Sequence, residues 1–186
     1  NREFKKNSFT TEELLAISGD SGHSYAKHLH FSILQTKNWS SLNPFLEMPK
    51  YKDEKPPIIE GMFLKIYDRY IQLRNSSSIR LTRNYPLLVK IRDTISGNER
   101  LGIYKLIVEH NDKEILNNVF KNIDKADSTL KVNSKEFLDV FDDKDYYKVK
   151  GIDYVEGDNK FKITAFDYNG NTSSEIFTLK IDLDME

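Results

Sequence analysis

The sequence contains no cysteine among its 186 residues. This absence excludes disulfide bonds, cysteine nucleophiles and thiolate metal sites, and it is compatible with an oxidising or a reducing compartment. Apolar runs are also short. None approaches the roughly 20 residues that a membrane-spanning helix needs, so we predict no transmembrane segment.

An excess of charge of one sign is lacking too. The 28 Lys and Arg residues nearly balance the 29 Asp and Glu residues, which gives a formal net charge of −1. This balance argues against a broad basic surface, and we expect no nucleic-acid partner.

Hydrophobic residues make up 38% and aromatic residues 12%, which is enough to build ordered cores in one medium domain or two small ones.

The clearest break in the chain is at residues 51–57, which read Y-K-D-E-K-P-P. Charged residues followed by two prolines favour an extended connector rather than a helix. We therefore predict a short first domain over residues 1–52, a linker over residues 53–57 and a second domain over residues 58–186.

The patterns predict an all-β chain, with a partial antiparallel β-sheet followed by a β-sandwich. The D-Y-N-G-N run from Asp167 to Asn171 separates two alternating stretches, which is typical of a hairpin. We interpret this run as a turn rather than a calcium loop, because it lacks spaced acidic ligands and a terminal bidentate Glu. Apolar spacing at residues 134–141 indicates one short helix. The strand candidates of the second domain are residues 58–67, 79–82, 87–91, 102–109, 160–166 and 174–181.

Two of the four histidines lie on a predicted strand at residues 28–34. His28 and His30 project to the same face, about 7 Å apart along the strand axis. Two such imidazoles can serve one small site, one as a metal ligand and the other as a proton-transfer group. The H-x-H pattern alone is explained as readily by two solvent-facing histidines.

The surrounding residues favour a site. Residues 19–31 read G-D-S-G-H-S-Y-A-K-H-L-H-F and resemble, without gaps, the C-terminal signature of the lysostaphin/LytM-type zinc metalloendopeptidases. These enzymes cleave peptide cross-links in bacterial peptidoglycan. The L-N-P-F sequence at residues 42–45 is similar to the hydrophobic-Asn-Pro-hydrophobic ending of that family. The second domain resembles the Ig-like modules that some envelope peptidases carry.

The resemblance implies roles for both histidines. Family members hold zinc with two histidines and one aspartate and keep a water in the open position. By this resemblance His30 would be a zinc ligand, and His28 would be the catalytic histidine beside the metal. It also implies peptidoglycan peptides as the substrate, an envelope protein as a further candidate partner, and a location in the bacterial cell envelope, periplasmic or secreted.

The sequence departs from the family at one important point. An H-x-x-x-D motif supplies the other two zinc ligands in the family, and none occurs in these residues. We therefore expect zinc in a complete parent protein but no tightly bound zinc in this chain alone. Two explanations stay open: a portion of a longer peptidase, which the start at Asn1 favours, or a non-catalytic peptidase-like scaffold, binding module or activator. An unpaired strand edge at residues 29–34 is a candidate surface for dimer formation.

Overall fold

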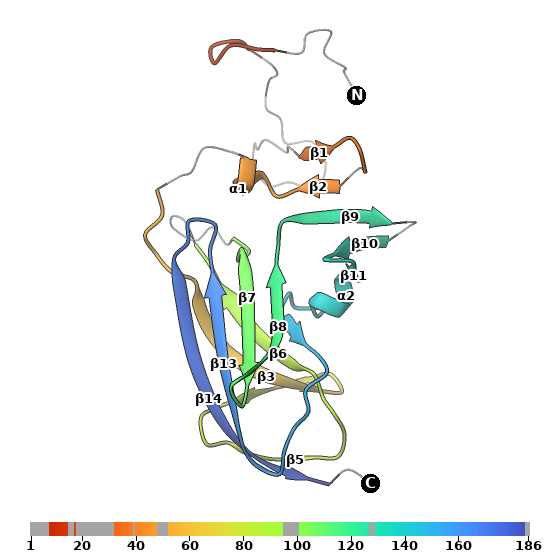
Figure 1. The fold of residues 1–186 in the computed structure, drawn as a ribbon, viewed down its shortest axis with the longest axis vertical. Helices are drawn as coiled ribbons and strands as arrows, with labels where there is room; N and C mark the ends of the chain where they lie inside the picture. Colours follow the sequence, from red (N-terminus) through yellow and green to blue (C-terminus); the bar gives the residue numbers. More distant parts are fainter. Residues whose placement is uncertain are drawn as a thin grey trace. The chain divides into compact units, whose positions relative to one another are not determined.

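The computed structural model describes residues 8–14, 17, 32–38, 40–47, 52–94, 101–126 and 129–184 (Figure 1). Strands dominate these residues, and the only helices among them are two single turns, so the predicted all-β class is confirmed. Two compact units divide between Ser32 and Ile33. All of the strands and helices below lie in the second unit, and the domain limits predicted at residues 52 and 58 stay a prediction.

Two sheets form a sandwich within the second unit (Figure 1). One sheet has the strand order β12-β6-β3-β4, and the other has the order β5-β14-β13-β7-β8. The chain passes repeatedly between the sheets, as in the Greek-key connections of Ig-like sandwiches. All neighbouring strands are antiparallel except β5 and β14, which are parallel. The strands are β3 (Ile58–Ile66), β4 (Arg69–Leu73), β5 (Ser78–Leu81), β6 (Leu87–Arg92), β7 (Lys105–His110), β8 (Lys113–Val119), β12 (Tyr147–Val149), β13 (Gly157–Phe166) and β14 (Thr172–Leu183).

The predicted hairpin at the end of the chain is confirmed as β13 and β14. Their pairing runs without interruption from Gly157 opposite Ile181 to Phe166 opposite Thr172. Alternate residues of β13 are buried, because successive side chains of a strand point to opposite faces of the sheet. The turn at residues 167–171 then reverses the chain.

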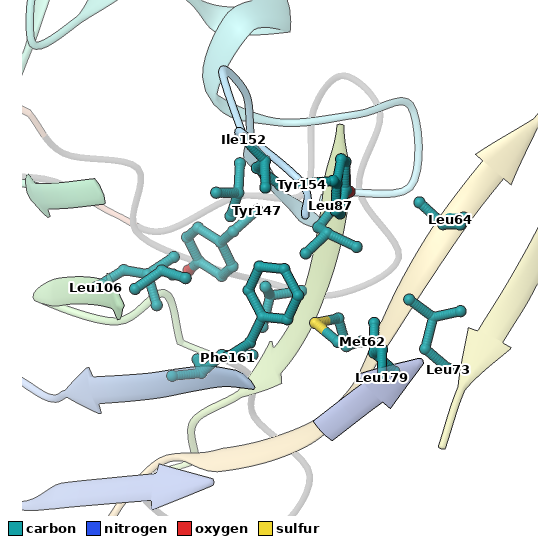
Figure 2. Close-up of a cluster of buried hydrophobic side chains, with 14 of the residues drawn as sticks. Met62, Leu64, Leu73, Leu87, Leu106, Tyr147, Ile152, Tyr154, Phe161 and Leu179 are labelled. Carbon is teal, nitrogen blue, oxygen red and sulfur yellow. The ribbon is translucent and has the colours of Figure 1, made fainter. Parts of the chain in front are cut away.

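The core lies between the two sheets and contains side chains from both. Phe161 on β13 is fully buried, and Met62 on β3 and Leu106 on β7 belong to the same cluster (Figure 2). Burying one large apolar side chain contributes roughly 1.5–3 kcal/mol to stability relative to leaving it exposed. The sandwich is therefore held together chiefly by this cluster.

A third sheet, made of short strands, combines the residues before the linker with an insertion between β8 and β12. Its strand order is β1-β2-β9-β10-β11, and β1 is an edge strand of the described sheet. Residues 28–31 of the predicted strand lie outside the described residues. The strands are β1 (Ile33–Gln35), β2 (Ser40–Leu42), β9 (Asn122–Ala126), β10 (Thr129–Val132) and β11 (Lys135–Glu136), and α1 (Pro44–Glu47) follows β2.

The helix expected at residues 134–141 is only one turn long, α2 (Phe137–Val140). Glu136 before it has the extended backbone angles φ −63° and ψ 151°, and Phe141 after it is extended with φ −123° and ψ 158°. The two residues before the helix belong to β11, which pairs with β10. Strand pairing therefore replaces the N-terminal part of the expected helix.

We predict that Phe161→Ala will lower the free energy of unfolding by about 3–5 kcal/mol, because the variant loses the buried ring and leaves a cavity. Ile176→Ala on the neighbouring strand is the matched control. Ile176 is 48% exposed, so its truncation should cost far less. Urea denaturation of both variants measures the difference, and equal losses would show that the core is not centred on Phe161.

Candidate functional site

The two histidines that the sequence singles out, His28 and His30, lie outside the described residues. Their roles as catalytic residue and zinc ligand stay predictions. What the structure describes is the segment that follows them and the surfaces of the sandwich.

The L-N-P-F sequence is attached firmly to the sandwich. Asn43 caps α1, because its Oδ1 accepts the N–H of Phe45 at 3.1 Å, and a proline suits the first helical position. The backbone N–H of Asn43 donates to the carbonyl of Lys121 at 2.8 Å, and its side-chain amide donates to the hydroxyl of Tyr168. The ring of Phe45 lies against the ring of Tyr168, with centroids 5.3 Å apart. Asn43 thus connects the helix to the turn between β13 and β14.

A cavity of about 560 Å³ opens beside this attachment. One wall comes from β2 and Asn43, a second from β6 and residues 101–103, and a third from the insertion that carries α2. Four aromatic rings gather along it, with neighbouring centroids 4.7–5.9 Å apart. These rings belong to Phe120, Phe137, Phe141 and Tyr147. We call this cavity the aromatic groove.

The charged side chains that line the aromatic groove include a set of ion pairs. Glu60 lies 2.8 Å from the Nζ of Lys90 and 3.0 Å from the Nε of Arg92. Lys144 is also at the groove and lies over the ring of Tyr70, 4.1 Å from its centroid. The apolar interior and the polar rim suit a ligand that presents apolar groups together with hydrogen-bonding groups.

Tyr147 is the most buried ring of the groove, with 7% of its surface exposed. Its hydroxyl oxygen accepts the N–H of Ile103 at 3.3 Å. Burial raises the pKa of this hydroxyl to about 12, although the hydrogen bond from Ile103 acts in the opposite direction. The neutral phenol is therefore favoured in the folded state.

Three carboxylates gather at a second place. One oxygen from each of Asp53, Asp93 and Asp167 lies within 4.8 Å of the other two. Asp93 and Asp167 are each only 1% exposed. Burial is the main cause that raises the pKa of Asp93 to about 6, and the charges of Asp167 and Asp53 act in the same direction. Among the residues that the structure describes, these three carboxylates form the cluster that could hold a metal ion.

His110 has a structural role. Its Nε2 lies 2.8 Å from the Oδ1 of Asn159. The side-chain nitrogen of Asn159 donates to the carbonyls of Val155 and Gly157, so its oxygen is the acceptor and His110 is the donor. The imidazole stacks on Phe161 with centroids 4.5 Å apart. His110 is therefore a hydrogen-bonded core residue.

A protein-family model matches residues 56–182. The chain belongs to this family. The matched region, which we call the family domain, contains the sandwich except for Leu183 at the end of β14, and the insertion with β9–β11, but not residues 19–31. No curated protein and no solved structure matches the chain. None of the helices in the described ranges is long and apolar enough to cross a membrane.

Sequence reasoning missed the aromatic groove and the cluster of Asp53, Asp93 and Asp167, which we call the acidic group. Asp167 belongs to a turn that the sequence predicts, but Asp53 and Asp93 come from distant parts of the chain. Only the fold brings the three together. A charged D-E pair in the linker and an Asp at the end of a strand are too common to identify a site by themselves.

We predict that the buried hydroxyl of Tyr147 makes the family domain sensitive to alkaline pH. Its folded-state pKa lies above the ordinary value of 10, so its contribution is fully present below pH 10 and is lost as pH rises through about 12. The loss amounts to roughly 3 kcal/mol at most. Denaturation between pH 8 and 12 should show a weaker pH dependence in Tyr147→Phe than in the unmodified protein.

Tyr67→Phe is the control for this experiment, because Tyr67 is 85% exposed. Its pH dependence should match that of the unmodified protein. Identical curves for Tyr147→Phe and the unmodified protein would contradict the prediction.

Proposed function

We propose that this chain is a portion of a zinc-dependent peptidoglycan endopeptidase of the bacterial cell envelope, periplasmic or secreted. The ungapped resemblance of residues 19–31 to the LytM-type signature carries the proposal. The L-N-P-F sequence follows at residues 42–45, in the order that the family shows. His30 serves as a zinc ligand and His28 as the catalytic histidine, while an H-x-x-x-D motif absent from these residues supplies the remaining ligands.

The two histidines have different roles: His30 binds the zinc ion, and His28 transfers protons. Zinc, when bound, supplies a water of lowered pKa and polarises the scissile carbonyl. His30 binds through a neutral imidazole nitrogen. His28 lies two residues away on the same face of the predicted strand, so it can hold or transfer a proton near neutral pH.

The anchoring of Asn43 supports a peptidase segment that ends at a fixed point. Asn43 is hydrogen-bonded to Lys121 and Tyr168 of the family domain. In addition, Ser41 of β2 pairs with Ile123 of β9. The family domain therefore holds the residues that directly follow the proposed active-site strand.

A second candidate function is a non-catalytic, peptidase-like envelope protein that acts as a scaffold, binding module or activator. Two observations favour it. The sequence lacks the H-x-x-x-D motif, and the aromatic groove of about 560 Å³ offers a binding surface that needs no metal. Its ligand would be a peptidoglycan peptide or a segment of an envelope protein.

The enzyme proposal is tested by sequencing and assaying the parent polypeptide that, under this proposal, carries residues upstream of Asn1. We expect it to contain H-x-x-x-D and to release new amino groups from cross-linked peptidoglycan peptides. His28→Ala should keep the zinc but lower the rate by about 10²–10⁴-fold, and His30→Ala should lose both zinc and activity. His23→Ala should keep the activity. A parent protein without the motif and without hydrolysis supports the scaffold instead.

Zinc binding by residues 1–186 alone gives a separate prediction. A catalytic zinc needs three protein ligands, and the resemblance supplies only His30. We expect calorimetry to detect no tight, stoichiometric zinc binding. One-to-one binding below micromolar that disappears in His30→Ala would contradict this expectation and would make Asp20 and His23 the first additional ligands to test.

A further inference from the structure

The diproline linker meets the sandwich at a group of three carboxylates. Asp53 comes from the linker, Asp93 directly follows β6, and Asp167 begins the turn between β13 and β14. One oxygen of each lies within 4.8 Å of the others. Two oxygens that bind one Ca²⁺ ion at about 2.4 Å can lie at most about 4.8 Å apart. The separations therefore do not exceed the limit for two oxygens that share one calcium ion.

Two of these carboxylates each have a buried oxygen without a hydrogen-bond partner. These atoms are Oδ2 of Asp93 and Oδ2 of Asp53. The other oxygen of each carboxylate is occupied, because Oδ1 of Asp93 accepts the N–H of Thr94 at 2.9 Å and Oδ1 of Asp53 accepts the N–H of Lys55 at 3.0 Å. The backbone thus orients both carboxylates and leaves one oxygen of each without a proton donor.

An ionised, buried oxygen of this kind is costly unless a hydrogen-bond donor or a positive charge faces it. Asp93 is 1% exposed, and a buried carboxylate oxygen that receives no hydrogen bond is unfavourable even when the other oxygen of the same group has a donor. Within the described residues, none of the ion pairs includes Asp53, Asp93 or Asp167. The described side chains therefore supply no compensating cation.

The turn and the linker are held in position by one another. Oδ1 of Asp167 accepts the N–H groups of Asn169 and Asn171, both at 2.8 Å. The side-chain amide of Asn171 donates to Oδ2 of Asp167 at 2.7 Å and to the backbone carbonyl of Asp53 at 3.0 Å. Asn171 therefore fixes Asp167 and Asp53 relative to each other, which a binding site requires.

We propose that Asp53, Asp93 and Asp167 bind one Ca²⁺ ion, and that this ion fixes the linker against the turn end of the family domain. All three side chains are hard oxygen ligands, which Ca²⁺ prefers. Mg²⁺ has the stricter requirement, because it binds oxygens at about 2.0–2.1 Å in a nearly ideal octahedron. The proposal rests on no part of the peptidase function, so either can fail without the other.

Calorimetry with CaCl₂ on the chelator-treated chain tests the proposal. We expect one Ca²⁺ per chain with a dissociation constant below about 1 mM, and a rise in Tm of roughly 5–10 °C at about 100 times that concentration. Asp93→Asn and Asp53→Asn should each weaken binding at least tenfold. Asp53→Asn lies in the linker, so it keeps the test valid if Asp93→Asn fails to fold.

Asp112→Asn is the matched control. It removes the same charge from a turn residue whose side chain is 82% exposed and pairs with Lys160, so calcium affinity should not change. Limited proteolysis at residues 51–55 gives a second readout, and Ca²⁺ should slow this cleavage in the unmodified chain but not in Asp53→Asn. The absence of binding below 1 mM, an equal response to MgCl₂, or full affinity in Asp53→Asn would each overturn the proposal.

Discussion

The pairing of β13 with β14 is the constraint on which the rest of the family domain depends. β7 pairs with the free side of β13, and β5 pairs in parallel with the free side of β14. This hairpin also places Phe161 at the centre of the core and carries the turn that contains Asp167 and Tyr168. A change of register by one residue would exchange the buried and exposed faces of both strands. The core, the sheet that contains β5, β14, β13, β7 and β8, and the acidic group therefore all depend on the register of this hairpin.

The elements that the sequence predicts well are those with a strong local signal. The final hairpin combines alternating apolar residues with a turn sequence, and both lie within about 25 residues. β4 was not predicted, because its only buried residue is Leu73 and a short, exposed strand has no clear alternation. The small third sheet was missed for another reason. Ser41 pairs with Ile123, and no local period reveals a contact between residues so far apart.

The two candidate sites also differ in how strong a local signal the sequence gives for them. His28 and His30 stand out in the sequence because they belong to one continuous motif, although they lie outside the described residues. The acidic group has the opposite character. Asp167 on its own predicts a turn and nothing more, since its carboxylate accepts the turn's N–H groups. Its proximity to Asp53 and Asp93 is a property of the fold, because each residue comes from a different part of the chain.

The turn between β13 and β14 holds the preceding chain at two points. Tyr168 accepts a hydrogen bond from the side chain of Asn43, and Asn171 donates one to the carbonyl of Asp53. Asn43 and Asp53 are therefore both attached to the same five-residue turn. Shortening or loosening this turn would release both residues together. A cation bound by Asp53 and Asp167 would strengthen one of the two attachments without changing the other, so the sandwich could retain its fold while its hold on the preceding segment varied with calcium.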